Sequence, residues 1–269
     1  MLEVTNLSHT YQRGGVVHTA IDGVTFTVAD GELVSIVGPS GSGKTTLLRC
    51  IGGLLTPTSG SIVLDDVPVR QVPDGLAVVF QDYSRSLYPW LTAVDNVALP
   101  LRRKPLRRAQ RRGAALAALA TVGLADSADR YPWQLSGGMQ QRVAIARALA
   151  CDPVLLLMDE PFGSVDAQTR EDLEDLILRV SRSRGIMILM VTHDIDESVY
   201  VGDRVIVLTR GPGRVRAELL TGLPEPHDQI KTRELPAFVR LRAQVGRLVR
   251  GSPPAPDGSG RQEGHADHS

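Results

Sequence analysis

The chain has 269 residues with 30 basic and 30 acidic side chains, so its formal net charge is zero, and its apolar fraction is 42%. These values are ordinary for a soluble globular protein, and they exclude a disordered or collagen-like chain. A zero net charge gives no support to a globally basic nucleic-acid binder, so no nucleic-acid partner is expected. Only three of the basic residues are lysines, Lys44, Lys104 and Lys231, which makes a specific role for a lysine easier to recognise.

The two cysteines and the N-terminus bear on the compartment. Cys50 and Cys151 lie in apolar surroundings 101 positions apart, which predicts two buried thiols in a reducing compartment. The N-terminus has no basic stretch followed by an apolar one, so a signal peptide is not expected. No apolar run approaches the roughly 18 residues that a spanning helix needs. We therefore expect a cytosolic protein, which leaves work beside an integral membrane partner open.

In chain order, short apolar runs alternate with helical patterns. The predicted strands cover 25–28, 33–37, 154–158, 186–191 and 205–208. The predicted helices between them cover 45–51 and 167–184. This alternation predicts an α/β fold with a mainly parallel sheet. Such sheets place their ligand-binding loops at the carboxyl ends of the strands.

The middle and the end of the chain depart from this alternation. Helical patterns rich in Ala, Leu and Arg cover 95–101, 110–122 and 138–150. After a breaker at 224–226, apolar residues recur at helical spacing and predict one amphipathic helix. We therefore predict a core of residues 1–82 and 151–223, an inserted helical subdomain of residues 83–150, a C-terminal helical extension of residues 224–250, and a disordered tail of residues 251–269.

A glycine-rich loop between the 33–37 strand and the 45–51 helix fits the pattern G-x-x-x-x-G-K-[ST]. Glycines let backbone N–H groups curl around phosphate oxygens, and the helix N-terminus adds partial positive charge. Lys44 can reach the β- and γ-phosphates as a point charge, which the bulkier, planar arginine cannot do as well, and Thr45 can offer its hydroxyl to Mg²⁺. The predicted nucleotide-binding residues here are Gly38, Pro39, Ser40, Gly41, Ser42, Gly43, Lys44, Thr45 and Thr46.

Two adjacent carboxylates, Asp159 and Glu160, follow the apolar run 154–158. Adjacent residues on a strand point to opposite sides, so the two carboxylates can do different work. We expect Asp159 to hold Mg²⁺ and Glu160 to face the γ-phosphate, where it can orient or deprotonate a water. The alternative, a solvated acidic turn, fits poorly after five apolar residues.

The segment Leu135–Gln141 resembles the signature motif of the ATP-binding-cassette ATPases. On its own, a Ser-Gly-Gly helix start would be a capping device, but here it lies between the phosphate loop and the paired carboxylates. A serine hydroxyl and glycine amides at a helix start form a second phosphate cradle. In this family the cradle contacts ATP held by the other subunit, so the resemblance implies a head-to-tail homodimer that binds two ATP. The residues that it assigns to this contact are Ser136, Gly137, Gly138 and Gln140.

The resemblance also implies a fold and further site residues. The fold is a P-loop NTPase core with a mainly parallel sheet, an N-terminal antiparallel β subdomain and an inserted α-helical subdomain. Tyr11 matches the aromatic residue that stacks on adenine, although a loop-packing role is an alternative. Asp166 matches the loop that communicates across the dimer. Gln81 matches the glutamine that contacts Mg²⁺ and the attacking water, and His193 matches the switch histidine near the γ-phosphate, although a lone histidine is more often structural.

The catalytic residues implied together are Glu160, His193, Gln81 and Lys44, and the Mg²⁺ ligands are Thr45, Gln81 and Asp159. The branch of the family follows from chain length. Chromosome-type members insert hundreds of residues before the signature, but Lys44 and Ser136 are only 92 positions apart. Translation-linked members usually carry two cassettes in one chain.

The segment Pro89-Trp90-Leu91-Thr92 and the residues around it resemble importers of the nitrate, sulfonate and taurine type. The resemblance implies a peripheral ATPase subunit on the cytoplasmic face of the cell membrane. It would power uptake of a small anion or organic solute through a separate integral membrane permease, served indirectly by an extracytoplasmic solute-binding protein. The alternative is a soluble ABC-type ATPase switch that is not engaged in transport.

Two surface features keep alternatives open. Trp90 and Leu91 could form a groove for a permease helix, or they could pack inside the helical insertion. Residues 102–112 hold seven cations and no acid. We expect this run to be a solvated loop and helix start, with contact to anionic lipid or nucleic acid as the alternative.

Overall fold

The computed structural model describes residues 1–82, 86–163 and 165–251. Its larger sheet has the strand order β10-β9-β3-β8-β7-β6. The strands from β9 to β6 run parallel, and β10 lies antiparallel to β9 at one edge. The strands of this sheet are β3 (Leu33–Val37), β6 (Leu76–Val79), β7 (Leu155–Asp159), β8 (Met187–Thr192), β9 (Arg204–Leu208) and β10 (Val215–Leu220). The prediction of a mainly parallel sheet is confirmed.

The smaller sheet is antiparallel and has the order β2-β1-β4-β5. Its strands are β1 (Leu2–Arg13), β2 (Val16–Val28), β4 (Ser59–Leu64) and β5 (Val67–Pro68). β1 and β2 form a long hairpin whose turn contains Gly14 and Gly15, both with positive φ. Glycine suits such a turn because it adopts positive φ without a Cβ clash.

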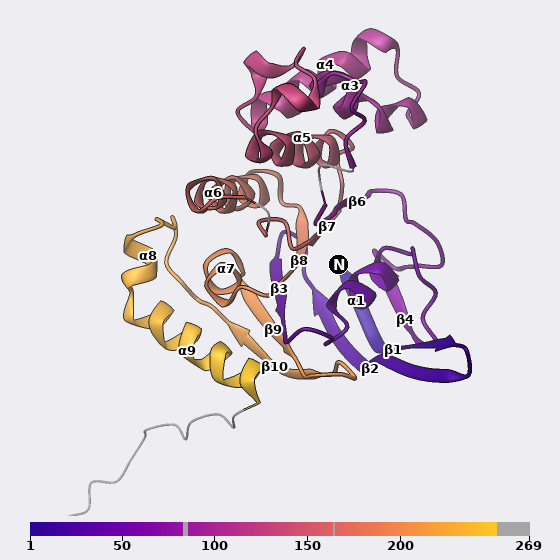
Figure 1. The fold of residues 1–269 in the computed structure, drawn as a ribbon, viewed down its shortest axis with the longest axis vertical. Coiled ribbons are helices and arrows are strands. Elements are labelled where there is room, and N and C mark those ends of the chain that lie inside the picture. Colours follow the sequence, from indigo (N-terminus) through magenta and orange to yellow (C-terminus); the bar gives the residue numbers. More distant parts are fainter. Residues whose placement is uncertain (83–85, 164, 252–269) are drawn as a thin grey trace, which may run out of the picture.

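Helices cover both faces of the larger sheet (Figure 1). The α-helices are α1 (Lys44–Ile51), α3 (Ala93–Ala98), α4 (Arg108–Thr121), α5 (Gly137–Ala150), α6 (Ala167–Arg184), α7 (Ile195–Val201), α8 (Lys231–Glu234) and α9 (Pro236–Arg250). Short 3₁₀ helices are η1 (Pro100–Arg103), η2 (Ala125–Ser127) and η3 (Pro132–Gln134). In Figure 1, α3, α4 and α5 form a lobe above the sheet, inserted in the chain between β6 and β7. None of the helices in these ranges is long and apolar enough to cross a membrane.

Alternation along β3 divides the protein into two hydrophobic cores. Leu33 and Val37 contact the core that holds the helical lobe, α6, α7 and α9. Val34 and Ile36 point the other way, into the core built with α1 and the antiparallel sheet. Successive side chains of a strand point to opposite faces, so a strand that is apolar throughout needs cover on both sides. This is why the run 33–37 is buried along its whole length.

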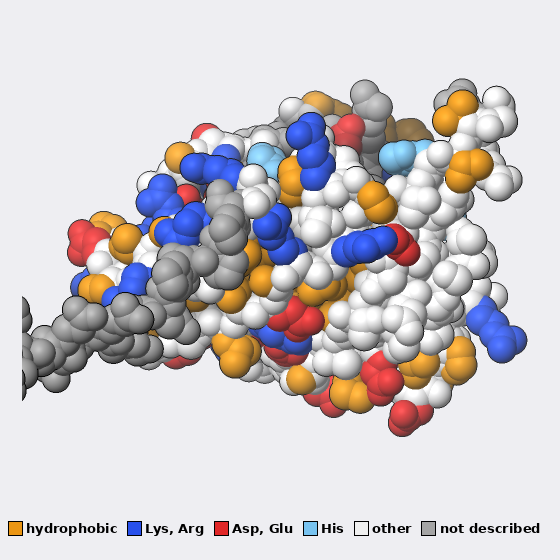
Figure 2. Space-filling view, turned by 90° about the horizontal axis from the view of Figure 1, so that it is seen from below, with side chains coloured by type: hydrophobic (Ala, Val, Ile, Leu, Met, Phe, Trp, Pro, Cys, Tyr) orange, Lys and Arg blue, Asp and Glu red, His pale blue; other side chains and the backbone are white. Residues whose placement is uncertain are grey.

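The C-terminal helix α9 is amphipathic, as its spacing predicts. Phe238, Val245 and Leu248 are buried against the larger core. The opposite side is exposed and basic, and Figure 2 shows basic side chains gathered on the side of the molecule where this helix lies. These exposed residues are Arg240, Arg242, Arg247 and Arg250.

Several predicted elements agree with the structure to within one or two residues, and α6 matches at both ends. Asp166 caps its N-terminus, and Gly185 ends it in a left-handed conformation. The start signal and the stop signal of this helix are therefore both visible in the sequence. The sequence missed β4, β10 and α7. The proposed domain boundaries stay a prediction, and the predicted tail lies outside the described residues apart from Gly251.

The prediction for the cysteines is half right. Both thiols are free, and Cys50 is buried, but Cys151 is only partly buried. Cys151 caps the C-terminus of α5, where the chain turns toward the surface, so only part of its side chain is covered. Burial raises the pKa of the Cys50 thiol to about 11, which keeps it protonated near neutral pH.

A close approach of two helices fixes the position of the signature segment. Gly138 lies in the first turn of α5, and a Cβ added there would sit 2.3 Å from Cγ2 of Thr169 on α6 and 3.3 Å from its Oγ1. Thr169 cannot turn away freely because its hydroxyl donates to Asp166 at 2.7 Å. Glycine at this position is therefore a packing requirement of a single chain, in addition to any contact with nucleotide.

We predict that Gly138→Ala lowers the free energy of unfolding by about 1–3 kcal/mol, the usual cost of overpacking. Thr169→Ser removes the methyl group that clashes and keeps the hydroxyl, so the double variant should regain most of the loss. Gly113→Ala on α4 is the control, since a Cβ there meets nothing within 4 Å. Denaturant unfolding measures all four proteins. Equal loss in the single and the double variant would contradict the proposed clash.

Candidate active site

The phosphate loop surrounds a cavity of about 480 Å³ at the carboxyl end of β3. The loop connects β3 to α1, so the backbone N–H groups at the start of this helix lie beside the cavity. The residues that line it are Ser40, Gly41, Ser42, Gly43, Lys44, Thr45, Thr46, Glu160 and His193. The structure thus brings the predicted loop together with two residues that follow other strands.

The backbone conformation of the phosphate loop requires glycine at position 43. Gly43 has φ +81°, and a Cβ there would lie 2.5 Å from the carbonyl oxygen of Ala20 on β2. The backbone of the loop therefore presses directly against the antiparallel sheet. This contact ties the start of α1 to β2 and fixes the loop N–H groups relative to the cavity.

Lys44 is the one charged side chain of the loop. Its ammonium group donates to the carbonyl oxygens of Gly38, at 2.7 Å, and Pro39, at 3.3 Å. Burial lowers the pKa of Lys44, and the nearby Glu160 and Asp159 oppose that shift. An ammonium group has three donors, so Lys44 keeps one for an anion in the cavity. Its chemistry matches the role predicted for it.

Thr45 and Asp159 place two oxygen atoms side by side. The Thr45 hydroxyl lies 3.4 Å from Oδ1 of Asp159, which is longer than a good O–H···O hydrogen bond, so both oxygens keep lone pairs for another ligand. Burial raises the pKa of the Asp159 carboxyl, and the Thr45 hydrogen bond opposes that rise. A hydroxyl and one carboxylate are the protein ligands that Mg²⁺ takes beside nucleotide phosphates. These residues fit that ion.

Glu160 contacts two of the other predicted residues, Gln81 and His193. Its Oε2 accepts a hydrogen bond from Nε2 of Gln81 at 2.8 Å and lies 3.3 Å from Nδ1 of His193. The Glu160 backbone has φ +45° and donates to the carbonyl of Val191 at 2.9 Å. The two carboxylates do serve different neighbours, but the cause is this left-handed turn after β7. We expected the alternation of side chains along a strand to separate them, but β7 ends at Asp159, so Glu160 is not part of the strand.

Tyr11 lies beside the phosphate loop. Its hydroxyl is 3.2 Å from Oγ1 of Thr46, and its ring contacts His9 edge to face with centroids 4.6 Å apart. The residue is 37% exposed, so it does not pack into a core. Its position suits an aromatic platform at the edge of the loop, and the contact with adenine stays a prediction.

The signature motif lies apart from the phosphate loop of the same chain. Ser136 caps α5 by accepting from the backbone of Met139 at 3.3 Å, and the Gln140 amide donates to the carbonyls of Pro132 and Leu135. No signature residue lines the phosphate cavity. Figure 1 shows α5, which the motif begins, and α1, which the phosphate loop begins, in different parts of the molecule. One chain therefore does not bring its two phosphate cradles together.

Asp166 caps the N-terminus of α6 in its own chain. Its carboxylate accepts from the backbone N–H of Thr169 at 3.0 Å and from the Thr169 hydroxyl at 2.7 Å. These hydrogen bonds lower the pKa of Asp166. The group is fully exposed, so it presents a charged carboxylate at the surface, at the N-terminus of α6.

Two polar residues that hold the signature helix to neighbouring segments were not predicted from the sequence. The buried Gln141 amide donates to the carbonyl of Pro161 at 2.6 Å, directly after Glu160. The Arg147 guanidinium donates to the carbonyl and hydroxyl of Ser86, and its burial lowers its pKa. Both are polar residues on the buried side of α5, and that break in the apolar pattern is the signal that could have identified them.

Trp90 does not pack inside the helical lobe. It is 68% exposed, and it contacts Tyr88 edge to face with centroids 5.4 Å apart. The turn that presents it is held by Asn96, which is fully buried, accepts from the backbone of Tyr88 and donates to the carbonyl of Leu91. The buried Asn96 amide therefore stabilises the turn that exposes Trp90 to solvent. The alternative that Trp90 packs inside the helical insertion is wrong.

The basic run 102–112 is largely a solvated surface. Lys104 donates to the carbonyl of Cys151 at 2.6 Å, and Arg112 pairs with Asp129 at 2.9 Å. Such contacts satisfy part of the charge within the protein and favour the solvated interpretation.

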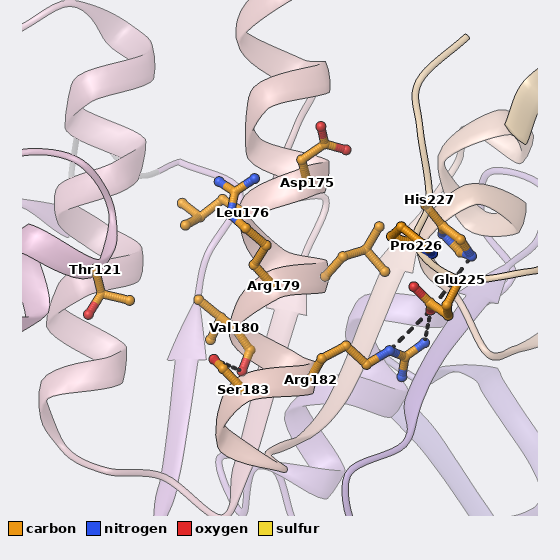
Figure 3. A pocket seen from close by; sticks show the side chains of 11 residues that line it. Thr121, Asp175, Leu176, Arg179, Val180, Arg182, Ser183, Glu225, Pro226 and His227 are labelled. Carbon is orange, nitrogen blue, oxygen red and sulfur yellow. Dashed lines mark hydrogen bonds and ion pairs between the residues drawn. The ribbon is translucent and has the colours of Figure 1, made fainter. Parts of the chain in front are cut away.

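A larger cavity of about 800 Å³ lies between α6 and the segment 225–227 (Figure 3), and it shares no lining residue with the cavity at the phosphate loop. Arg182 crosses it and pairs with Glu225 and with Asp203. None of the residues that line this cavity belongs to the predicted site. Size alone therefore does not locate the chemistry, and the smaller cavity at the phosphate loop is the candidate active site.

Comparisons with known proteins identify the family of the chain. The family model described as ABC transporter matches residues 21–163. A taurine import ATP-binding protein from Chromobacterium violaceum is 49% identical over 201 residues, which cover 75% of this chain and 76% of the relative. A nitrate import ATP-binding protein from Synechocystis sp. is 42% identical over 257 residues, 93% of this chain and 95% of the relative.

The solved structures agree as well. A dimeric ATP-binding cassette in a post-hydrolysis state, bound to ADP and phosphate, superposes with a TM-score of 0.73 at 38% identity, and the match covers 82% of this chain and 98% of that one. The fold, the phosphate loop and the sequence match lead to the same conclusion. The chain belongs to the ABC transporter family of ATP-binding cassette ATPases.

Proposed function

We propose that this ATPase is the ATP-binding subunit of an importer, which powers uptake of a small anion or organic solute through a separate membrane permease. The observation that carries the proposal is the Glu160 carboxylate, which contacts Gln81 and His193 beside the phosphate loop. The relatives described above support the importer assignment, since their names include taurine import and nitrate import. Their solutes differ, so nitrate, sulfonate, taurine and similar compounds all remain within the proposal. None of these relatives favours the soluble switch.

Binding of ATP rests on charge neutralisation. The loop N–H groups and the N-terminus of α1 face the phosphates, and Lys44 adds a full charge from its partly buried position. Thr45 and Asp159 would hold Mg²⁺, with Gln81 as a further ligand. The ion would supply positive charge to the phosphate oxygens. Tyr11 would contact the adenine ring from the edge of the loop.

Hydrolysis rests on positioning a water. We propose that Glu160 orients or deprotonates the attacking water, because its carboxylate borders the cavity and is fixed by two neighbours. Gln81 would hold the carboxylate on one side, and His193 would hold the γ-phosphate side on the other. Phosphoryl transfer needs positioning and electrostatic stabilisation more than covalent chemistry, so this small set of groups is sufficient.

A second copy would complete each site. Because the signature residues lie apart from their own phosphate loop, Ser136, Gly137, Gly138 and Gln140 can act on nucleotide only in another subunit. The dimeric cassette that this chain resembles supports such an arrangement. ATP would contact both subunits only in the closed dimer and so would favour closure. Asp166 would lie at the contact between the subunits.

The permease would bind at the exposed aromatic surface formed by Tyr88 and Trp90, whose rings are in contact and which are 42% and 68% exposed. An aromatic group held in solvent marks an interaction surface. The subunit would then lie on the cytoplasmic face of the membrane, and a solute-binding protein on the other side would deliver the solute.

Glu160→Gln should keep ATP binding, trap the closed dimer and lower the hydrolysis rate by more than about 100-fold, the usual range for losing one positioned group. Glu234→Gln is the matched control, because Glu234 is exposed and lies outside the site. Phosphate release gives the rate, and light scattering after chromatography with ATP gives the mass. Hydrolysis near the wild-type rate would refute the role of Glu160.

Replacing Trp90 and Leu91 by Asp should abolish co-purification with the membrane permease while ATP binding persists, since two charges would enter an apolar contact. Leu220→Asp is the control, because Leu220 on β10 is 75% exposed and lies outside the aromatic surface. Purification from detergent-solubilised membranes, followed by identification of the bound chains, measures the effect. A complex that stays intact would show that this surface is not the permease contact.

A further inference from the structure

A second carboxylate, Glu197, is buried near the active site and has no part in the mechanism above. It lies on α7 and is 4% exposed. Its Oε2 accepts a hydrogen bond of 2.6 Å from the hydroxyl of Thr192. Thr192 is the last residue of β8 and immediately precedes His193, so this bond holds the N-terminal side of the histidine loop.

The other oxygen of the same carboxylate leads to a different helix. Oε1 of Glu197 lies 3.5 Å from Nε of Arg170 on α6, and Nη1 of Arg170 lies 3.6 Å from Oδ2 of Asp194. The Asp194 backbone in turn donates to the Thr192 hydroxyl at 3.0 Å. The residues on both sides of His193 therefore belong to one cluster, which contains a single arginine and is tied to the start of α6.

The contacts of Arg170 are incomplete. Its Nε is buried and has no hydrogen-bond partner among the residues that the structure describes. Its two ion contacts are longer than a charge-assisted hydrogen bond, which measures about 2.7–2.9 Å. A small displacement of α6 would shorten or break them. Arg170 lies in the first turn of this helix, and its backbone donates to the carbonyl of Asp166 at 2.9 Å. Arg170 is therefore fixed to the N-terminal end of α6.

Burial of this carboxylate is costly. It raises the pKa of Glu197 to about 7, with Asp194 and Glu174 adding to the rise and Thr192 and Arg170 opposing it. A buried acid that serves packing alone is replaceable by an apolar residue at little cost. The arrangement of Thr192, Arg170 and Asp194 around Glu197 instead determines the path of the loop that carries His193.

We infer that Glu197 is a positioning residue for His193, and that Arg170 makes this position depend on the start of α6. The inference rests on the proposed role of His193 in hydrolysis. Arg170 thereby links the histidine loop to the first turn of α6, and Glu197 sets the position of that loop. His193 then contacts Glu160 from the side that faces the cavity.

Another buried carboxylate offers a matched comparison. Glu174 on α6 is fully buried, and its Oε2 accepts from Arg233 at 2.7 Å and from Gln229 at 3.1 Å. These hydrogen bonds lead to the C-terminal extension, and Glu174 acts on Glu197 only through its charge. Glu174→Gln should therefore cost stability and leave the rate of hydrolysis in the folded protein close to that of the wild type.

The test examines separately the contact of Glu197 with Thr192 and its contact with Arg170, in the full-length dimer. Thr192→Val removes the hydroxyl and keeps the shape, while Thr192→Ser keeps the hydroxyl. Glu197→Gln keeps an acceptor for Thr192 but turns an amide toward Arg170. We expect Thr192→Val and Glu197→Gln each to lower kcat about ten-fold with KM for ATP within about two-fold, as for a group that acts through a neighbour. Thr192→Ser should keep the wild-type kcat.

Two comparisons decide the outcome. Glu174→Gln should lower Tm and keep kcat, so an equal loss of kcat there would overturn the inference in favour of a general loss of stability. Thr192→Val should have no further effect in a His193→Ala background, and an additional ten-fold loss would also overturn it. If His193→Ala alone keeps the wild-type kcat, the proposed role of His193 fails first. If His193→Ala is slow while Thr192→Val and Glu197→Gln are normal, only the inference about Glu197 fails.

Discussion

Backbone hydrogen bonds between β3, β8, β7 and β6 bring four distant segments to one edge of the sheet. Val37 pairs with Thr192, Asp159 with Val191, and Val79 with Met158, so these strands end at nearly the same level. Parallel strands expose their carboxyl ends together. The phosphate loop, His193, Glu160 and Gln81 each follow one of these ends, so the register of the sheet determines the distances within the site. Every contact of Glu160 depends on it.

The same sheet leaves the site incomplete. The signature helix lies in the helical lobe, fixed to the core by Gln141 and by the close approach of Gly138 to Thr169. The lobe is well packed, yet it holds its phosphate cradle away from the cavity of its own chain. In the proposed dimer a second copy would close this separation, and the exposed Trp90 surface would be the contact through which closure reaches the permease. The position of the helical lobe thus accounts both for the separation of the signature segment from the phosphate loop and for the exposure of Trp90.

The sequence predicts much of the fold and of the site, because the strongest signals are local. The glycines of the phosphate loop, the buried run 33–37 and the caps Asp166 and Gly185 act within a few residues of their position. The remaining features depend on distant neighbours. The edge strand β10 is only partly buried and so carries a weak apolar pattern. The left-handed turn at Glu160 needs the carbonyl of Val191, and the burial of Glu197 needs α6 to lie against α7.

The central claim is that one chain holds half of each catalytic site. The most direct measurement is the rate of ATP hydrolysis per chain, at saturating Mg²⁺ and ATP, over a wide range of protein concentration. If the site forms between two copies, turnover per chain will fall toward zero on dilution and reach a plateau at high concentration. A turnover per chain that stays constant down to concentrations at which light scattering detects only monomer would contradict the account.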